Sequence, residues 1–431
     1  MIKIAVLGLG SRGKNYGNLL NREADVQIVS VCDKVQAKID KTAAKWKVPA
    51  AACFTNDSDF FKQGRIADAL IIATQDRDHY AHAMTALKLG YDILMEKPVS
   101  PDIGECLEIE KYARENNRKV LVCHVLRYAP YYRRVKEIID SGLIGDIREI
   151  RHSENISYWH FAHSYVRGNW RRESQTSPML LAKCCHDMDL LYWYTDSKCR
   201  SLSSYGNLDY FKKENAPDGC AENCFDCKYQ KTCIYDAEYY YAGRRRAVGR
   251  TGRKFPWGTY AICTSGRRED ILNALKTDEK GKLWARCVFK CDNDVVDNQQ
   301  VLMEMENGVK CVFTVNAFNE KNHRHMEIRG TKGELTMDDK GSVMRVRVFD
   351  RKVKKIRTNF ISAIKGHAGG DQGIAKAVLA MLRNDADKNL RYTWIRDTIE
   401  SHRIVGAAEI SRREGGRKVD MTEIPDILLE K

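Results

Sequence analysis

The chain has 431 residues, of which 43% are hydrophobic and 30% are charged, and its formal net charge is +14. This length predicts two or three domains, and this composition excludes a disordered chain. No apolar run approaches the ~20 residues that a membrane-spanning helix needs, and no signal peptide is expected because the first predicted strand begins at Ile2. We therefore expect a cytoplasmic globular protein without a membrane partner.

The positive charge favours anionic partners, but it does not choose among nucleic acids, phosphosugars and uronic acids. The densest basic stretch runs from Arg244 to Lys254 and carries neither aromatic platforms nor a known binding module. A solvated loop is predicted there, and no nucleic-acid partner is expected.

The first 33 residues have the pattern of a dinucleotide-binding unit. A strand is predicted over Ile2–Leu7, a helix follows to about Leu20, and a second strand covers Val26–Cys32. Between the first strand and the helix stands G-x-G-x-x-G, whose glycines permit a tight turn, approach of the pyrophosphate and close packing of the helix. The predicted cofactor-binding residues of this unit are Gly8, Gly10, Ser11, Arg12, Gly13 and Asp33.

Asp33 follows the second predicted strand directly. At that position a carboxylate can accept both ribose hydroxyls and would repel a 2′-phosphate, so NAD is favoured over NADP. Two alternatives stay open. Asp33 also suits a helix N-cap, since Gln36 stands three residues later, and both Lys34 and Arg12 can meet a phosphate.

Strands and helices continue to alternate up to residue 124, which predicts a parallel sheet with helices on both faces. Ligands of such sheets lie at the carboxyl ends of the strands. Pro98 holds Lys97 in an extended backbone at one of these ends, where its ammonium would lie above the cofactor crevice; an ordinary surface lysine is the alternative. The predicted cofactor-binding residues at the later strand ends are Thr74, His79, Glu96 and Lys97.

Residues 86–98 read ALKLGYDILMEKP, and with the glycine turn, Asp33 and the helix at His79 they resemble the Gfo/Idh/MocA family. The family takes its name from glucose–fructose oxidoreductase and inositol dehydrogenase. The likeness extends through Arg127-Tyr128 and the region of His186, and covers most of residues 1–200. It implies a nicotinamide-binding Rossmann domain with a parallel sheet, here residues 1–124. It also implies an α+β domain over 125–431, with a large and mostly antiparallel open sheet.

The resemblance further implies sugar or cyclitol substrates, and a lysine of the EKP tripeptide, here Lys97, that binds a substrate hydroxyl beside the nicotinamide. The family usually carries an aspartate where this chain has Ala182, and Lys183 stands one residue later. This departure resembles a subgroup with a Lys-x-x-His pair.

A helix predicted over residues 178–194 carries Lys183 and His186, whose spacing of three places them on one face. Oxidising an alcohol requires removal of the hydroxyl proton while hydride leaves carbon, which suits a histidine or a buried lysine. We expect His186 to be the acid/base, with Asp189 able to orient it, and Lys97 and Lys183 to polarise the reacting oxygen. The alternative is a surface ion pair of Lys183 with Asp187 or Asp189 and a structural His186.

Residues 160–171 mix donors with aromatic rings, as sugar sites do, and residues 366–371 form a glycine-containing turn before a predicted helix. Asp371 in that turn is also a plain N-cap. The predicted substrate-binding residues are Arg127, Tyr128, His163, Arg167, Trp170, Asp187 and His367.

Residues 295–350 alternate apolar and polar side chains, and Asn307-Gly308 marks a hairpin. The alternation predicts a sheet with one covered face and one face that meets solvent or a partner subunit. A homo-oligomer, a dimer or a tetramer, is expected from the family resemblance.

Four cysteines follow C-x3-C-x2-C-x5-C inside a polar insertion over about residues 211–263. In a reducing compartment such cysteines are thiols or metal ligands rather than disulfides. Their spacing can bring four thiolates to one ion, most readily a structural zinc. An iron–sulfur cluster and four unligated thiols are the alternatives. The predicted ligands are Cys220, Cys224, Cys227 and Cys233.

Together these features predict an NAD-dependent oxidoreductase that transfers hydride between nicotinamide and a hydroxyl-bearing carbon of a sugar, sugar derivative or cyclitol. A glycoside hydrolase that works through transient oxidation and elimination is the second hypothesis. A nucleotide-sensing protein without catalysis is the third.

Overall fold

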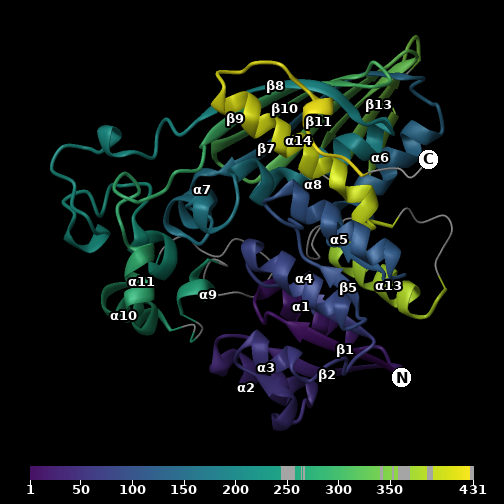
Figure 1. Cartoon of the computed structure of the whole chain (residues 1–431). Coiled ribbons are helices and arrows are strands. Elements are labelled where there is room, and N and C mark those ends of the chain that lie inside the picture. The colour runs from purple at the N-terminus through teal and green to yellow at the C-terminus, as the bar shows by residue number, and fades with distance from the viewer. Residues whose placement is uncertain are drawn as a thin grey trace.

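The computed structural model describes residues 1–243, 258–263, 265, 267–339, 343–351, 354–357, 369–385 and 392–427. These residues form two sheets (Figure 1), a parallel sheet from the N-terminal residues and a larger sheet whose strands begin at Ile147. The predicted fold class is confirmed, since the first sheet is a Rossmann sheet and the second is mostly antiparallel.

The first sheet has six parallel strands in the order β3-β2-β1-β4-β5-β6. Its apolar strand runs are buried on both faces, as parallel sheets require. The strands are β1 (Ile2–Leu7), β2 (Val26–Cys32), β3 (Cys53–Phe54), β4 (Ala69–Ile72), β5 (Asp92–Met95) and β6 (Val120–Val122). The helices between them are α1 (Ser11–Leu20), α2 (Gln36–Trp46), α3 (Asp57–Phe61), α4 (His79–Lys88) and α5 (Ile103–Glu115).

Helices from the far end of the chain complete the cores on both faces of this sheet. On one face, Ile374 and Val378 of α13 (Gly370–Leu382) share a core with α1 and α2. On the other face, Ile395 and Ile399 of α14 (Ile395–Arg413) pack with α4 and α5. Two helices of the segment predicted as the second domain therefore complete the core of the first domain. Figure 1 shows α13 beside the parallel sheet.

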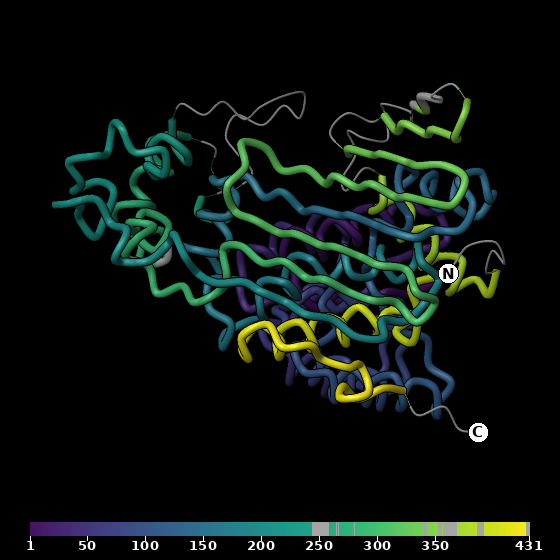
Figure 2. The backbone as a smooth tube through the Cα atoms, turned by 90° about the horizontal axis from the view of Figure 1, so that it is seen from above, coloured from purple at the N-terminus to yellow at the C-terminus, as the bar shows by residue number. Residues whose placement is uncertain are grey.

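The second sheet has nine strands in the order β14-β13-β12-β11-β7-β10-β9-β8-β15, and Figure 2 looks onto it. Among the strand pairs of this second sheet in the described residues, only β7 and β10 are parallel. The strands are β7 (Ile147–Ser157), β8 (Cys199–Asn207), β9 (Asn298–Met305), β10 (Lys310–Asn319), β11 (His323–Gly330), β12 (Gly333–Asp338), β13 (Val343–Val348), β14 (Lys354–Arg357) and β15 (Val419–Asp420).

One face of this sheet is buried and the other is not, as the alternation predicts. Val301, Met303 and Met305 of β9 enter the core, whereas Leu302 between them is 58% exposed. The core lies between the sheet and the helices α6 (Pro130–Asp140), α7 (Tyr158–Phe161), α8 (Met179–Thr195) and α14. Among the helices of the described segments, none is both long and apolar enough to cross a bilayer.

Residues 208–297 form an insertion between β8 and β9, and it reaches beyond the predicted end near residue 263. Residues 285–287 belong to the insertion because they form backbone hydrogen bonds with residues 222–224. Cys224 N donates to Ala285 O and Cys287 N donates to Glu222 O, both at 2.8 Å. Its helices α9 (Thr259–Ile262), α10 (Arg268–Thr277) and α11 (Glu279–Trp284) surround a separate small core. In Figure 1 the insertion projects to one side of both sheets.

Candidate active site

The glycine turn between β1 and α1 has the close contacts that its sequence predicts. Gly8 has a φ of +94°, and a Cβ there would lie 2.3 Å from the carbonyl oxygen of Ala73. A Cβ on Gly13 would lie 2.0 Å from the carbonyl oxygen of Gly8. A Cβ on Gly10, by contrast, would meet open space, and Gly10 caps the N-terminus of α1 at Ser11. The turn therefore fits a phosphate at the helix N-terminus.

Asp33 follows β2, and its carboxylate is held by the backbone. One oxygen accepts from Leu9 N at 2.7 Å and the other from Val35 N at 2.9 Å, while the Lys38 ammonium lies 3.3 Å away. These bonds fix the carboxylate beside the glycine turn. A carboxylate has about four acceptor positions, so this arrangement still fits a ribose hydroxyl.

Arg12 is placed differently from the cofactor contact that we expected. Its guanidinium donates to Glu96 at 2.7 Å and to Asp371 at 2.8 Å and bonds to the hydroxyl of Tyr16. Asp371 lies in the first turn of α13, whose N-cap is Gly369, so the N-cap expected at Asp371 is wrong. Its bonds to Arg12 anchor α13 to the Rossmann sheet. The contacts of Arg12 join elements of the protein, because its permanent charge is balanced by two carboxylates that are themselves buried.

Lys97 is brought to the second domain at the end of β5. Its Nζ donates to the carbonyl oxygen of Ala182 in α8 at 2.6 Å, directly before Lys183. Behind it, the Lys97 N–H donates to Glu96, and His79 Nδ1 donates to Pro98 O at 2.7 Å. Glu96 and His79, both predicted to meet the cofactor, therefore shape the backbone around Lys97. Thr74 Oγ1 lies 3.1 Å from His82 Nδ1 at the neighbouring strand end.

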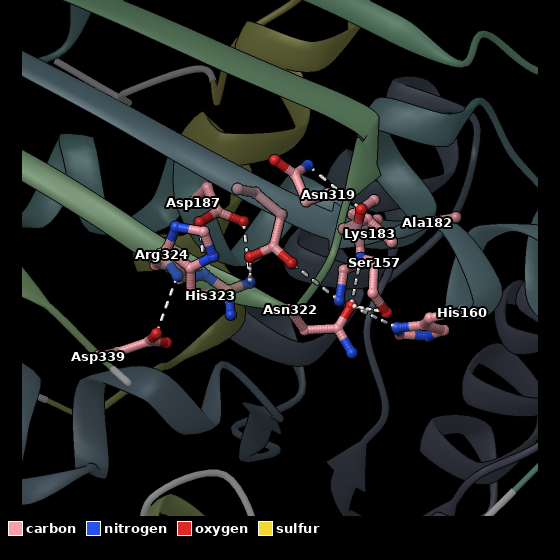
Figure 3. A network of polar contacts seen from close by, with 12 residues as sticks. Ser157, His160, Ala182, Lys183, Asp187, Asn319, Asn322, His323, Arg324 and Asp339 are labelled. Carbon is pink, nitrogen blue, oxygen red and sulfur yellow. Dashed lines mark hydrogen bonds and ion pairs between the residues drawn. The ribbon is translucent and has the colours of Figure 1, made fainter. Parts of the chain in front are cut away.

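A network of buried charges stands beside Lys97 at the start of α8 (Figure 3). The Lys183 ammonium lies 3.1 Å from Glu154 of β7, and Glu154 also lies 2.8 Å from the guanidinium of Arg324 in β11. Arg324 in turn donates to Asp187 at 2.7 and 3.1 Å, and His152 Nε2 lies 2.7 Å from the same carboxylate. Lys183 therefore pairs with Glu154 on the sheet, and Asp187 belongs to Arg324 and His152.

The neighbours of Asp187 in this network lower its pKa. Burial alone would raise the pKa of Asp187, but Arg324 and His152 hold it well below its usual range. The His152 ring has a partner on each nitrogen. Its Nδ1 donates to the carbonyl oxygen of His325 at 3.1 Å, and its Nε2 faces Asp187. Glu154 lies between two cations, Lys183 on α8 and Arg324 on β11.

His186 lies one helical turn from Lys183 and is 7% exposed. Its ring packs edge to face on that of His124, with centroids 5.5 Å apart. Burial, together with Arg127 and Lys97, lowers the pKa of His124 well below its usual value, so His124 is neutral. The three predicted catalytic residues thus stand on two elements that meet at Ala182, namely the end of β5 and the first turns of α8.

Polar groups from three further segments face the same region. Asn322 Oδ1 accepts from the backbone and hydroxyl of Ser157 at 2.8 and 3.1 Å, and lies 3.0 Å from His160 Nδ1. Burial and the nearby charge of Lys183 lower the pKa of His160 to about 3. Figure 3 shows His160, Asn322 and Ser157 grouped near Lys183. A neutral imidazole and an amide suit a substrate with hydroxyl groups.

Several predicted substrate residues hold the protein together instead. Arg127 donates to Asp189 at 2.7 and 2.6 Å, and the Tyr128 hydroxyl accepts from Thr393 N at 2.9 Å. Both side chains are buried where α8 and the C-terminal segment meet. These contacts support a role in joining the domains.

Residues of the predicted sugar-binding segment are also engaged elsewhere. His163 stacks on Trp284 with centroids 4.3 Å apart and lies 2.8 Å from the Tyr241 hydroxyl, both in the insertion. Arg167 donates to backbone oxygens of Tyr235 and Arg286. Trp170 is partly exposed and packs against the second-domain core. His367 and the basic stretch from Arg244 to Lys254 lie outside the described residues.

The predicted zinc site is not supported. Within the described residues, no group of three or more His, Cys, Asp or Glu side chains is arranged to hold a metal ion. One small cavity is lined by four cysteines, namely Cys224, Cys227, Cys233 and Cys287. The fourth predicted ligand, Cys220, does not line this cavity and instead lies against Cys287. The guanidinium of Arg167 lies 3.3 Å from Cys224 Sγ, and its fixed positive charge disfavours a dication there.

Sequence reasoning missed Glu154, His152 and Arg324, although a pattern pointed to them. His152 and Glu154 occupy the same alternation as buried Ile150 and Ile156 of β7, so they interrupt an apolar face with charge. Such an interruption is costly unless the charges are paired, and it therefore marks a functional region. The partner Arg324 could not be identified, because its pairing with β7 depends on the register of β11.

Comparisons with known proteins agree with this architecture. Residues 2–124 match a family model described as an oxidoreductase family with an NAD-binding Rossmann fold, and residues 132–248 match the GFO/IDH/MocA C-terminal domain. A protein named as the oxidoreductase YteT of Bacillus subtilis is 22% identical over 63% of this chain and 60% of its own length. An inositol 2-dehydrogenase/D-chiro-inositol 3-dehydrogenase of Lactiplantibacillus plantarum is 24% identical over 48% and 55%.

A glycosyl hydrolase family 109 protein of Streptomyces niveus is 26% identical over 51% of this chain and 48% of its own length. The chain thus spans about half to three fifths of these curated relatives. Among solved structures, an inositol dehydrogenase homologue in complex with NAD+ from Azotobacter vinelandii superposes with a TM-score of 0.69. It covers 97% of both chains at 18% identity, which shows a shared fold.

Proposed function

Because the chain belongs to the GFO/IDH/MocA oxidoreductase family, we propose that it oxidises or reduces a hydroxyl-bearing carbon of a sugar, sugar derivative or cyclitol. The observation that carries the proposal is the 2.6 Å bond from Lys97 Nζ to Ala182 O. This bond supports the proposal because it joins the lysine at the end of the Rossmann sheet to the helix that carries Lys183 and His186.

We propose NAD as the cofactor, with NADP less favoured. The open space at Gly10 and the backbone-held carboxylate of Asp33 support this choice, since they suit a pyrophosphate and an unphosphorylated ribose. NAD, when bound, supplies the carbon that accepts or gives hydride. Ser11, at the first turn of α1, would lie at the phosphate end of the site.

The residues of the chain divide the proton chemistry between them. Lys183, whose ammonium lies 3.1 Å from Glu154, donates a hydrogen bond to the reacting oxygen. Lys97 donates beside it, since an ammonium carries three N–H groups and Ala182 takes one. His186 then holds the proton that leaves the hydroxyl, as imidazole can near neutral pH. His160 and Asn322 would bind further hydroxyls of the substrate.

The test is replacement of Lys97 by methionine, which keeps the length of the side chain and removes its charge. Turnover in an absorbance assay over sugars and cyclitols should fall about 10³-fold while NAD affinity, measured by calorimetry, stays within about twofold. Lys88→Met, at the exposed end of α4, is the matched control and should leave both unchanged. Unchanged turnover in Lys97→Met would reject the proposed role.

A second candidate is supported by the relative named as a glycosyl hydrolase of family 109. Transient oxidation makes a neighbouring C–H acidic, so that a glycosidic oxygen can be eliminated without net redox change. The stoichiometry separates the two activities, because a dehydrogenase forms one NADH per substrate consumed and such a hydrolase releases sugar with no net NADH.

We also propose that the protein acts in the cytoplasm as a homo-oligomer, a dimer or a tetramer. The support is the uncovered face of the nine-stranded sheet, where Leu302 is 58% exposed beside Val312 of the neighbouring strand. An apolar patch on an open sheet face suits a second copy of the same surface.

A further inference from the structure

Two thiols from distant parts of the chain meet at the base of the insertion. We call this region, where residues 220–224 lie against residues 285–287, the neck of the insertion. The sulfur atoms of Cys220 and Cys287 lie 4.0 Å apart, and both cysteines are free and partly exposed. The backbone fixes this approach, because Cys287 N donates to Glu222 O and Asn223 forms a bridge with Arg286. The proximity therefore follows from paired backbone segments rather than from one rotamer.

We propose that Cys220 and Cys287 form a reversible disulfide across the neck of the insertion when the protein meets hydrogen peroxide. A disulfide needs sulfur atoms about 2 Å apart, which rotation of two partly exposed side chains can supply. The link would close the base of the insertion between residues that are 67 positions apart in sequence.

The surroundings give the two thiols different roles. Cys287 lines the small cavity that Cys224, Cys227 and Cys233 also line, whereas Cys220 lies outside it. Lys290 flanks Cys220, since its ammonium donates to Cys220 O at 3.0 Å and lies 3.0 Å from Glu222. We assign the first attack on peroxide to Cys220, because it lies outside that cavity.

The chemistry balances in two steps. Cys220 sulfur attacks one peroxide oxygen, the O–O bond breaks, and the product is a sulfenic acid and one water. Cys287 sulfur then attacks the sulfenic sulfur, the S–O bond breaks, and the departing hydroxide takes the Cys287 proton to form a second water. Two thiols lose two electrons in total, and one peroxide is reduced.

The test uses the full chain, fully reduced, freed from reductant and then exposed to a small excess of hydrogen peroxide. Intact mass should fall by two hydrogens, a non-reducing peptide map should join the Cys220 and Cys287 peptides, and dithiothreitol should restore the starting mass. Cys220→Ser and Cys287→Ser should each abolish that joined peptide. Cys53→Ser, at a partly exposed thiol on β3, is the control and should retain it.

Lys290→Met provides a second measurement that does not remove a thiol. The rate of cross-linking should fall severalfold, since the cation beside Cys220 is lost while both sulfur atoms remain. A joined peptide between other cysteines, or no joined peptide at all, would overturn the proposal. Stoichiometric zinc or iron in the purified protein, released only when these thiols are alkylated, would also overturn it and make them ligands.

Discussion

Glu154 is the residue on which the charge balance around α8 depends. It is 1% exposed and is the carboxylate that Lys183 and Arg324 share. A buried charge that loses its partner costs far more than the pair contributes, because the remaining ion stays desolvated. The same carboxylate therefore serves the stability of the second domain and the position of the Lys183 ammonium.

Replacing Glu154 by glutamine keeps the shape and removes the charge, which leaves two cations without their shared partner. The free energy of unfolding in a urea titration should fall by about 3 kcal/mol. The ratio kcat/KM should fall at least about tenfold, with NAD affinity unchanged. Glu149→Gln, on the same strand but paired with the partly exposed Arg329, is the control and should cost under about 1 kcal/mol. Equal costs for both variants would contradict the role of Glu154.

His402 makes stability depend on pH. Burial and the neighbouring His124 lower its pKa to about 3, and its Nε2 accepts from Val99 N at 2.9 Å beside the Lys97–Pro98 segment. The unfolded chain binds a proton at the ordinary histidine pKa of 6.5, so this stability is fully present above pH 6.5. It is lost progressively as the pH falls from 6.5 towards 3.

Between pH 6.5 and about pH 5, His402 alone should cost about 2 kcal/mol of unfolding free energy. His402→Gln retains an acceptor for Val99 and removes the titration. Urea titrations at several pH values should show a shallower acid dependence for this variant than for the parent protein. The same slope in both proteins would show that His402 does not carry the effect.

At the scale of the element, the turn between β1 and α1 separates two uses of glycine. Gly13 is required by the fold, because the neighbouring backbone at Gly8 fills the space of a side chain. Gly10 meets no such obstacle, so the protein itself has no need of glycine there. Under our proposal, glycine at this position serves a ligand that approaches the backbone.

Alanine at each position tests that distinction. Gly13→Ala should lower the free energy of unfolding by about 2 kcal/mol or more, since its Cβ would lie 2.0 Å from Gly8 O. Gly10→Ala should change it by only a few tenths of a kcal/mol but weaken NAD binding about tenfold or more. Calorimetric titration together with thermal unfolding reads both effects. Full NAD affinity in Gly10→Ala would remove the turn as the pyrophosphate site.

At the scale of the whole molecule, later parts of the chain pack against earlier parts in two places. Helices α13 and α14 return to cover the Rossmann sheet, and the insertion folds back through residues 285–287 to its own beginning. Within the described residues, the outer face of the nine-stranded sheet stays uncovered, and Leu302 of β9 is exposed on it.

A charge at that position tests the proposed oligomer. Leu302→Glu should convert the assembly to monomers, or raise its dissociation constant at least about tenfold, in light scattering after size exclusion. Leu143→Glu, at a comparably exposed apolar side chain in the turn after α6, should leave the molecular mass unchanged. A parent protein that is monomeric at all concentrations would refute the proposal directly.

The sequence by itself determined the glycine turn, Asp33, Lys97 and the spacing of Lys183 and His186, and with them the Rossmann order and the alternating sheet. These are local patterns of period, turn chemistry and motif, so they need no knowledge of distant contacts. Only the tertiary structure decided the partners of those residues. Arg324 reaches Glu154 and Asp187 through strand register, Arg12 turns to Asp371 across more than three hundred residues, and Cys220 meets Cys287 instead of closing a metal site. Such pairings arise from long-range packing, in which buried charges and thiols take the neighbours that the whole fold supplies.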